Sequence, residues 1–242
     1  MGLERERTVA YLSGRARGKP GFGDFVIVNE RLAVDAWQGT EASFAVIAAL
    51  ARDAEGYVAV ARSDLTIPQA LKGQAVGTQV GSTSAWFLGE YLRAHGLSEV
   101  DVAVKPVAPE LMPTANPDVD AIAAFFLREP HATRVLTTHG SRMHRLATAK
   151  GYAAGYLLVG TWQEYLRSHP GVAERLLRAI EKGRRYAEAH PAEVIRFSRS
   201  MFSMTDTTLI EADYATNERV VGLDRVTLED FQKLSRWCVG GR

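Results

Sequence analysis

Residues 73–86 read GQAVGTQVGSTSAW, and this stretch predicts a short buried strand that runs directly into a helix. The strand spans 75–80, and Gly81 gives a tight turn where a side chain would obstruct an approaching ligand. The first N–H groups of a helix lack an internal partner, and the macrodipole adds partial positive charge there. Such a corner favours a sulfonate, carboxylate, phosphate or nitrate group. The residues that place hydroxyls and N–H groups at this helix start are Ser82, Thr83 and Ser84.

A purely structural role for this corner is the alternative. Ser82 or Thr83 can act simply as an N-cap, which stabilises a helix by about 1 kcal/mol. Trp86 and Trp162 are both interpreted as packing residues.

Composition narrows the function classes. The 242 residues suit one large domain or two small ones, and Lys plus Arg total 29 against 28 Asp plus Glu. A formal net charge of +1 gives no electrostatic reason to wrap nucleic acid or to lie on an anionic membrane. No run approaches the roughly eighteen apolar residues that a membrane span needs. The charged start, MGLERER, lacks the apolar segment of a signal peptide.

Metal and cofactor chemistry has no signature here. Cys238 is the single cysteine, so no disulfide can form within the chain and no cysteine cluster can hold a metal. The six histidines show no metal-ligand spacing, and His139 and His144 are separated by a glycine and a serine. We therefore expect no metal site and no cofactor.

Strands alternate with helices along most of the chain, which predicts an α/β protein with largely parallel sheets. Residues 57–61 are apolar on both faces, as in the central strand of a parallel sheet. Residues 44–51 could be strand or helix, since periodicity does not separate the two for a short apolar run. The other expected strands are 25–28, 101–107, 119–126 and 155–160. The expected helices after Gly81 lie near 83–95, 171–189, 192–199, 209–220 and 227–237, the last capped by Thr227.

Several segments, in order, resemble a known family. They are DLTIPQALKG at 64–73, VG at 76–77, GST at 81–83, DVDA at 118–121 and REPH at 128–131. Further on come YLLV at 156–159, TWQEYL at 161–166, HP at 169–170 and AHPAE at 189–193. Each segment is weak alone, but their order and spacing resemble the solute-binding proteins of ABC importers for sulfonates, taurine, nitrate and thiamine-pyrimidine precursors.

The resemblance implies a type II periplasmic-binding-protein fold, with two α/β lobes joined by two crossover strands and a helical C-terminal part. Lobe one would comprise residues 1–63 and 161–242, and lobe two residues 64–160. It implies a receptor, not an enzyme, that captures a small anionic organic solute by lobe closure and delivers it to ABC permease subunits. A sulfonate or taurine-like solute is the first expectation, followed by nitrate, and the receptor would be a monomer.

Ligands of open α/β sheets bind outside the carboxyl ends of the strands, which selects the candidate residues. In lobe two the anion would lie at Gly81, Ser82, Thr83 and Ser84. A polar or cationic end would meet Asn29, Glu30 and Glu129, and Phe126 would pack on an apolar middle.

Each of these assignments has a structural alternative. Glu129 could brace a loop before Pro130, and Asn29 and Glu30 could simply end a strand. Phe125 or Phe126 would be a core residue by default, since alternating residues of a strand cannot both face the cleft. The small basic cluster of Arg142, His144 and Arg145 is interpreted as solvated surface, and His131 as structural.

The chain departs from the family most clearly at its N-terminus. The family has a signal peptide and a first strand–helix unit ahead of the segment that matches 25–30, whereas about twenty loop-like residues stand there in this sequence. The resemblance implies a periplasmic or lipid-anchored protein, but without a leader the product would stay in the cytoplasm. Two other functions stay open: a superfamily enzyme acting on a small organic anion or pyrimidine, and a truncated receptor without a ligand.

Overall fold

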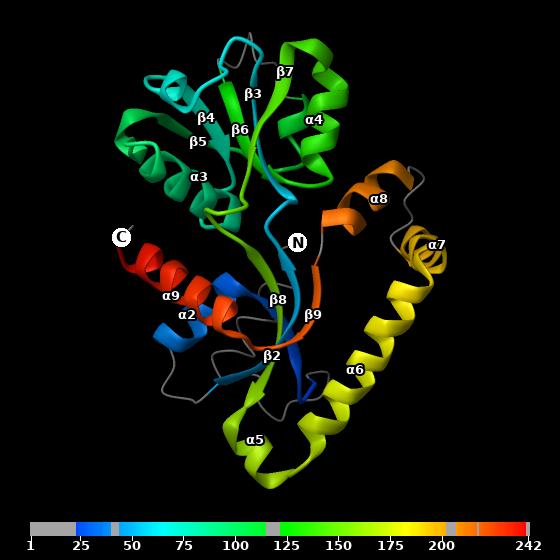
Figure 1. Cartoon of the computed structure of the whole chain (residues 1–242). Helices are drawn as coiled ribbons and strands as arrows, with labels where there is room; N and C mark the ends of the chain where they lie inside the picture. The colour runs from blue at the N-terminus through cyan, green and yellow to red at the C-terminus, as the bar shows by residue number, and fades with distance from the viewer. Residues whose placement is uncertain (1–22, 40–43, 115–121, 202–206, 217, 241–242) are drawn as a thin grey trace. The chain divides into compact units, whose positions relative to one another are not determined.

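Two compact units make up this protein in the computed structural model, which describes residues 23–39, 44–114, 122–201, 207–216 and 218–240 (Figure 1). Unit 1 comprises the residues up to Arg52, Tyr156–Pro191 and Glu218–Arg242, and unit 2 comprises Asp53–Gly155 and Ala192–Asn217. The chain therefore passes between the units four times, after residues 52, 155, 191 and 217. The predicted lobes divided the chain later, after residues 63 and 160, and kept 192–217 in lobe one.

The sheet of unit 1 has the strand order β1-β8-β2-β9. Its strands are β1 (Val26–Asn29), β2 (Phe44–Asp53), β8 (Gly155–Trp162) and β9 (Glu218–Gly222). β1 pairs antiparallel with β8, and β2 pairs antiparallel with β9. Residues 44–51, left open between helix and strand by their sequence, are therefore part of a strand. The ring of Phe44 lies where a Cβ on Gly160 would be, so the glycine lets the aromatic side chain pack across the sheet.

The helices of unit 1 are α2 (Glu30–Gly39), α5 (Gln163–Ser168), α6 (Val172–Ala189) and α9 (Arg225–Gly240). α2 contacts α9, and α6 contacts β9. The predicted cap of the last helix was wrong by three residues. Asp224 Oδ1 accepts hydrogen bonds from both the backbone N–H and the hydroxyl of Thr227, at 2.7 Å each, so the carboxylate is the capping group.

The sheet of unit 2 has the order β5-β4-β6-β3-β7. Its strands are β3 (Tyr57–Arg62), β4 (Ala75–Thr78), β5 (Ala103–Pro106), β6 (Ile122–Arg128) and β7 (Met143–Thr148). β4 is parallel to β5 and β6, but β3 is antiparallel to both of its neighbours. The prediction of a central strand in a parallel sheet was therefore wrong for β3. Its apolar run reflects burial on both faces, because α3 (Thr83–Ala94) and α4 (His131–His139) both contact it.

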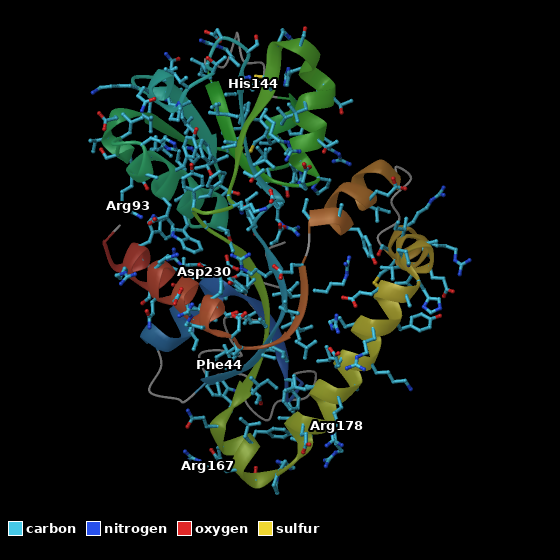
Figure 2. The ribbon with its side chains drawn as sticks, viewed as in Figure 1. Phe44, Arg93, His144, Arg167, Arg178 and Asp230 are labelled. Carbon is cyan, nitrogen blue, oxygen red and sulfur yellow. The ribbon has the colours of Figure 1, made fainter. Side chains whose placement is uncertain are left out.

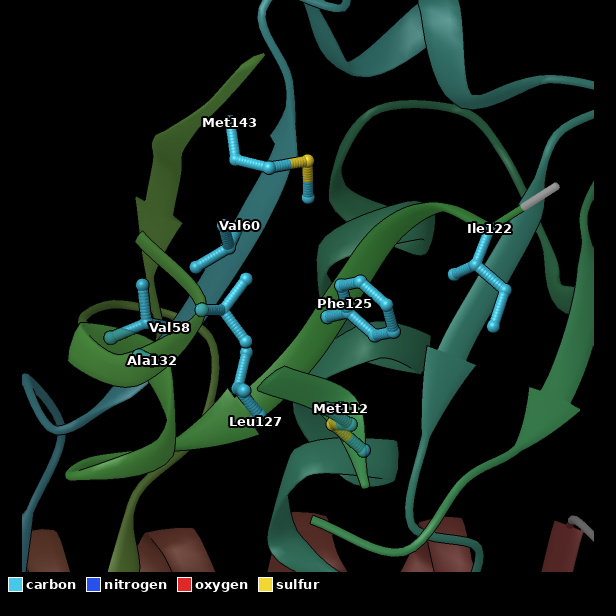
Figure 3. Close-up of a cluster of buried hydrophobic side chains, with 9 residues drawn as sticks. Val58, Val60, Met112, Ile122, Phe125, Leu127, Ala132 and Met143 are labelled. Atoms are coloured by element: carbon cyan, nitrogen blue, oxygen red, sulfur yellow. The ribbon is translucent and has the colours of Figure 1, made fainter. Parts of the chain in front are cut away.

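The core of unit 2 lies on both sides of β6, whose successive side chains point to opposite faces. Phe125 and Leu127 face a cluster that includes Ala132 and Val135 of α4 (Figure 3). Phe126 instead packs against Phe87 of α3, with ring centroids 4.9 Å apart. Neither phenylalanine is exposed to solvent, so this strand anchors a helix on each face.

Elements of the C-terminal part also differ from expectation. A single helix over 209–220 was wrong, because α8 (Thr207–Thr216) ends before β9, whose residues 218–222 pair with β2. α4 and β7 were not predicted from the sequence. α7 (Pro191–Met201) and four short 3-10 helices complete the described elements: η1 (Pro68–Leu71), η2 (Glu99–Asp101), η3 (Met112–Thr114) and η4 (Gly140–Arg142). Across the described residues, no helix has both the length and the apolarity that crossing a bilayer requires.

Candidate functional site

The candidate site of unit 2 lies at the carboxyl ends of its parallel strands. Thr78, the last residue of β4, lies opposite Pro106 of β5 and Phe126 of β6. The Thr78 hydroxyl donates a 3.1 Å hydrogen bond to the carbonyl of Phe126, which joins the two strand ends. Because these strands are parallel, the segments that follow them leave the sheet at one edge, and α3 and α4 both begin there (Figure 1). This is the edge where open α/β sheets bind ligands.

The predicted turn at Gly81 is present between β4 and α3, although β4 ends at Thr78 and not at Val80. Gly81 has φ of +72°, a left-handed conformation that favours glycine, and a Cβ there would meet no atom within 4 Å. Ser82 follows in extended conformation as the N-cap of α3. Its Oγ donates to the carbonyl of Gln79 at 2.5 Å and accepts from the N–H of Ala85 at 3.3 Å. The N-cap role that the sequence offered for Ser82 is therefore confirmed.

The Ser82 cap binds one N–H group in the first turn of α3. The first four N–H groups of any α-helix lack an intrahelical acceptor, and the Ser82 hydroxyl accepts from the N–H of Ala85. Thr83 and Ser84 begin the helix and are buried, while Gly81 beside them is exposed. The partial positive charge of the helix start is thus next to an open turn.

Glu129 binds a backbone N–H at the start of α4, the other helix that begins at this edge. Its Oε2 accepts from the N–H of Thr133 at 2.9 Å, and its Oε1 accepts from Nη2 of Arg145 at 2.9 Å. The residue is 2% exposed, and its own N–H donates to the carbonyl of Gly56 at 2.7 Å. Both carboxylate oxygens therefore bind groups of unit 2, which is the bracing role that the sequence offered as the alternative to ligand contact.

Phe126 has the contacts of a core residue. Its ring lies 4.9 Å from that of Phe87 and 5.6 Å from that of Tyr91, and the residue has no exposed surface. We therefore leave Phe126 out of the ligand site proposed below.

Asn29 and Glu30 belong to unit 1. Asn29 Oδ1 accepts from the N–H of Leu32 at 2.8 Å and so caps α2 at the end of β1. Glu30 is 2% exposed, and its Oε2 accepts from the N–H of Tyr156 at 2.8 Å. The two residues stand where β1 ends and α2 begins, and each side chain accepts from a backbone N–H of its own unit.

Unit 1 also holds a polar cluster that the sequence did not indicate. Tyr156 donates its hydroxyl hydrogen to Asp230 Oδ2 at 2.7 Å, and Arg52 Nε donates to the Tyr156 oxygen at 3.0 Å. Nη2 of Arg52 lies 3.4 Å from Asp230 Oδ2, and its Nη1 lies 3.7 Å from Glu218 Oε2. Asp230 is on α9 (Figure 2). Burial, followed by the bond to Asp230, raises the pKa of Tyr156, so the phenol stays protonated.

His131 and the basic residues Arg142 and Arg145 belong to unit 2. Burial lowers the pKa of His131, whose Nδ1 is buried without a hydrogen-bond partner among the described residues. Arg145 pairs with Glu129, and Arg142 Nη2 lies 3.3 Å from Nδ1 of His139. In the part of the chain that the structure describes, no group of three or more His, Cys, Asp or Glu residues could hold a metal ion.

The family model described as NMT1/THI5 like matches residues 32–194. The chain belongs to the NMT1/THI5-like family. The resemblance inferred from the ordered motifs is therefore confirmed. No curated protein sequence matches this family member.

Solved structures similar to this NMT1/THI5-like chain share its fold at low sequence identity. The aliphatic sulphonate binding protein SsuA from Escherichia coli has a TM-score of 0.83 and 14% identity, over 98% of this chain and 79% of that one. The alkanesulfonate-binding protein SsuA from Xanthomonas axonopodis, bound to MOPS, has 0.73 and 16%, over 97% and 78%. A Candida albicans protein described as having the generic periplasmic binding protein fold has 0.66 and 18%, over 96% and 77%. The predicted periplasmic-binding-protein fold is thus confirmed.

Proposed function

We propose that this chain is the solute-binding receptor of an ABC importer and that it captures a small anionic organic solute. The observation that carries the proposal is the start of α3, where an open left-handed turn at Gly81 leads into a helix capped by Ser82. Membership of the NMT1/THI5-like family and the fold shared with sulfonate-binding proteins support it.

The anionic group of the solute binds at α3 and not at α4. Both helices begin at the same edge of the sheet, but the start of α4 already has the Glu129 carboxylate on the N–H of Thr133. A second anion there would meet like charge at short range. The start of α3 has a neutral cap, the Ser82 hydroxyl, and its partial positive charge favours an anion.

A sulfonate is the first choice of solute class, and taurine or nitrate the next. Two of the similar structures carry sulfonate binding in their names, and sulfonate oxygens are good acceptors for helix N–H groups. Delivery to permease subunits, capture by lobe closure and a monomeric state stay predictions of the family resemblance, as does placement in the periplasm or at the cell surface.

Titration calorimetry of the purified chain against ethanesulfonate, taurine, nitrate and a pyrimidine tests the function. We expect a dissociation constant on the order of 1 μM for at least one of them, which corresponds to roughly −8 kcal/mol. If none produces heat or raises the melting temperature, the receptor function is rejected. Turnover of a bound compound by the pure protein would instead favour the superfamily enzyme.

A matched pair of variants tests the location. Asp and Asn are both strong N-caps, so Ser82→Asp and Ser82→Asn should each retain α3. Ser82→Asp adds a negative charge where the anion binds and should weaken affinity at least about tenfold, whereas Ser82→Asn should bind within a few-fold of wild type. Equal affinities for the two variants would place the anion elsewhere.

A further inference from the structure

Two of the passages between the units occur at the ends of neighbouring strands. β2 ends at Asp53 and β8 begins at Gly155, while the units divide between residues 52 and 53 and again between residues 155 and 156. The two strands are adjacent in the sheet of unit 1, and the 3.0 Å bond from Arg52 Nε to the Tyr156 hydroxyl shows that the two passages lie side by side. The contacts on each side of a passage decide where its backbone can rotate.

The first passage joins two successive residues that are held by opposite units. Arg52 pairs with Glu218 across β2 and β9, and its guanidinium binds the polar cluster of unit 1 described above. Asp53 is 4% exposed and is held by unit 2. Its Oδ1 accepts from the N–H of Gly56 at 2.6 Å, and its Oδ2 accepts from Arg128 Nε at 3.2 Å. The first passage is therefore one peptide group long.

The second passage has the same arrangement. Gly155 is buried, and a Cβ on it would lie 2.5 Å from a ring carbon of Tyr57, so this ring of unit 2 packs directly on the glycine backbone. Tyr156 is held by unit 1. Its N–H donates to Glu30 Oε2 at 2.8 Å, and its ring centroid lies 5.4 Å from that of Phe231. Two successive residues are again fixed to opposite units.

The remaining passages are of a different kind. Pro191 and Ala192, on either side of the third, are exposed at the start of α7, where the chain can follow a movement of either unit. The fourth passage follows residue 217, which lies outside the described residues, and Glu218 after it pairs with Arg52. The passages at residues 52–53 and 155–156 are therefore the two whose contacts define a position for rotation.

We propose that rotation of one unit against the other takes place at two joints, the residue pairs 52–53 and 155–156. Hinges absorb changes of φ and ψ at a few residues, and here the contacts on both sides restrict that change to one peptide group in each strand. Arg52 and Asp53 are the positioning residues of the first joint, because their contacts keep the flanking backbone out of the rotation. The inference goes beyond the proposed function and does not depend on which solute the chain binds.

Double electron–electron resonance between two spin labels measures how widely the units move. Thr138→Cys on α4 and Gln232→Cys on α9 supply one exposed site in each unit, while the native Cys238 is buried and should not react. Asp53→Ala frees the segment that follows it, so the distribution of label distances should widen by at least about 3 Å, the span of one residue. Arg52→Ala frees the other side of the joint and should widen the distribution as well.

Glu55→Ala is the matched control for Asp53→Ala. It removes a neighbouring acidic side chain, whose carboxylate accepts from the Thr148 hydroxyl at 3.0 Å and lies 2.8 Å from Lys150 Nζ, both in unit 2. These contacts do not hold the joint, so the width of the distribution should equal that of the labelled parent chain. Widening by Glu55→Ala equal to that by Asp53→Ala, or no widening by either joint variant, would overturn the inference.

Nitrogen-15 relaxation dispersion on the wild-type chain decides if the variants fail to fold. It detects exchange on the μs–ms timescale of hinge motions. The expected result is exchange at residues 52–53 and 155–156, with none at residues 54–56 or 150–154. Exchange spread over residues 53–57, or absent from both joints, would overturn the inference. Neither experiment involves a solute, so the receptor function is tested separately by the calorimetry described above.

Discussion

Glu129 shows how one side chain can be located correctly and still have a different partner. Its place after β6 follows from the sequence, because Pro130 ends the strand there. Its partners do not, since Arg145 lies 16 residues further along and the N–H of Thr133 belongs to a helix that no local pattern indicated. Phe126 is a similar case, because strand alternation predicts that one of the two adjacent phenylalanines is a core residue, whereas both are buried, on opposite faces of β6.

Replacing Glu129 with Gln should lower the free energy of unfolding by about 1–3 kcal/mol, because a buried charge-assisted pair and a helix cap are both weakened. Ethanesulfonate affinity should stay within a few-fold of wild type. Urea unfolding and calorimetry measure the two effects. The control is Glu229→Gln, which removes an exposed pair with Arg225 and should cost less than about 0.5 kcal/mol. A large loss of affinity at unchanged stability would return Glu129 to the ligand site.

At the scale of elements, those specified by neighbouring residues could be predicted, and those that depend on pairing between distant segments could not. The β4–turn–α3 unit follows from residues 73–86 because its turn, cap and strand are all specified locally. β9 was missed because residues 218–222 become a strand only by pairing with β2, far away in the sequence. Strand direction in unit 2 was equally hidden, since an apolar run records burial and not orientation.

The turn at Gly81 gives an element-scale prediction. Gly81→Ala should lower the free energy of unfolding by about 1–2 kcal/mol, because its φ of +72° is left-handed and costs any side chain with a Cβ. No atom lies within 4 Å of the new Cβ, so conformation and not crowding is the cause. Gly81→Asn should cost less, since Asn tolerates this region. Equal losses in urea unfolding would contradict the explanation.

The cap of α9 predicts a pH dependence. Hydrogen bonds from the Thr227 hydroxyl and then its backbone N–H hold the pKa of Asp224 below its ordinary value. Because the native pKa is lowered, the ionised carboxylate stabilises the fold at pH values above the unfolded pKa of about 3.9. This stabilisation is lost as the pH falls through the lower native pKa. Asp224→Ala should therefore be less stable than wild type by about 0.5–2 kcal/mol at pH 6. The difference in stability between wild type and Asp224→Ala should decrease between about pH 4 and pH 2. Thermal unfolding at several pH values measures it. A gap that stays constant with pH would show that the carboxylate charge is not involved.

At the scale of the whole molecule, the fold class could be predicted, and the predicted division of the chain differs from that of the two units. Ordered motifs gave the family and the periplasmic-binding-protein fold. The return of residues 192–217 to unit 2 had no sequence signal, because nothing in a helix with an exposed polar face tells which body it accompanies.

The contacts of Arg52 predict that three of the four passages between the units open together in amide exchange. Arg52, Tyr156 and Glu218 each stand at such a passage, and Arg52 contacts both of the others within unit 1. Arg52→Ala should lower the free energy of unfolding by about 1–3 kcal/mol and speed amide exchange near all three residues. The control is Arg178→Ala, which removes an exposed pair with Glu174 on α6 and should change little. Faster exchange confined to Arg52 itself would show that the passages are independent.

The four places where the chain passes between the units predict how the protein responds to a single cut in its backbone. A single backbone cut by a protease at any one of them leaves three strands of polypeptide tying the two bodies together. The two fragments then share no covalent bond, but each of the four cuts leaves a strand of one fragment paired with a strand of the other, β1 with β8 or β2 with β9. The nicked protein should therefore elute as one species under native conditions and separate into fragments only in denaturant. For the same reason, new chain ends created by circular permutation at one passage should be tolerated, provided that the original termini can be bridged.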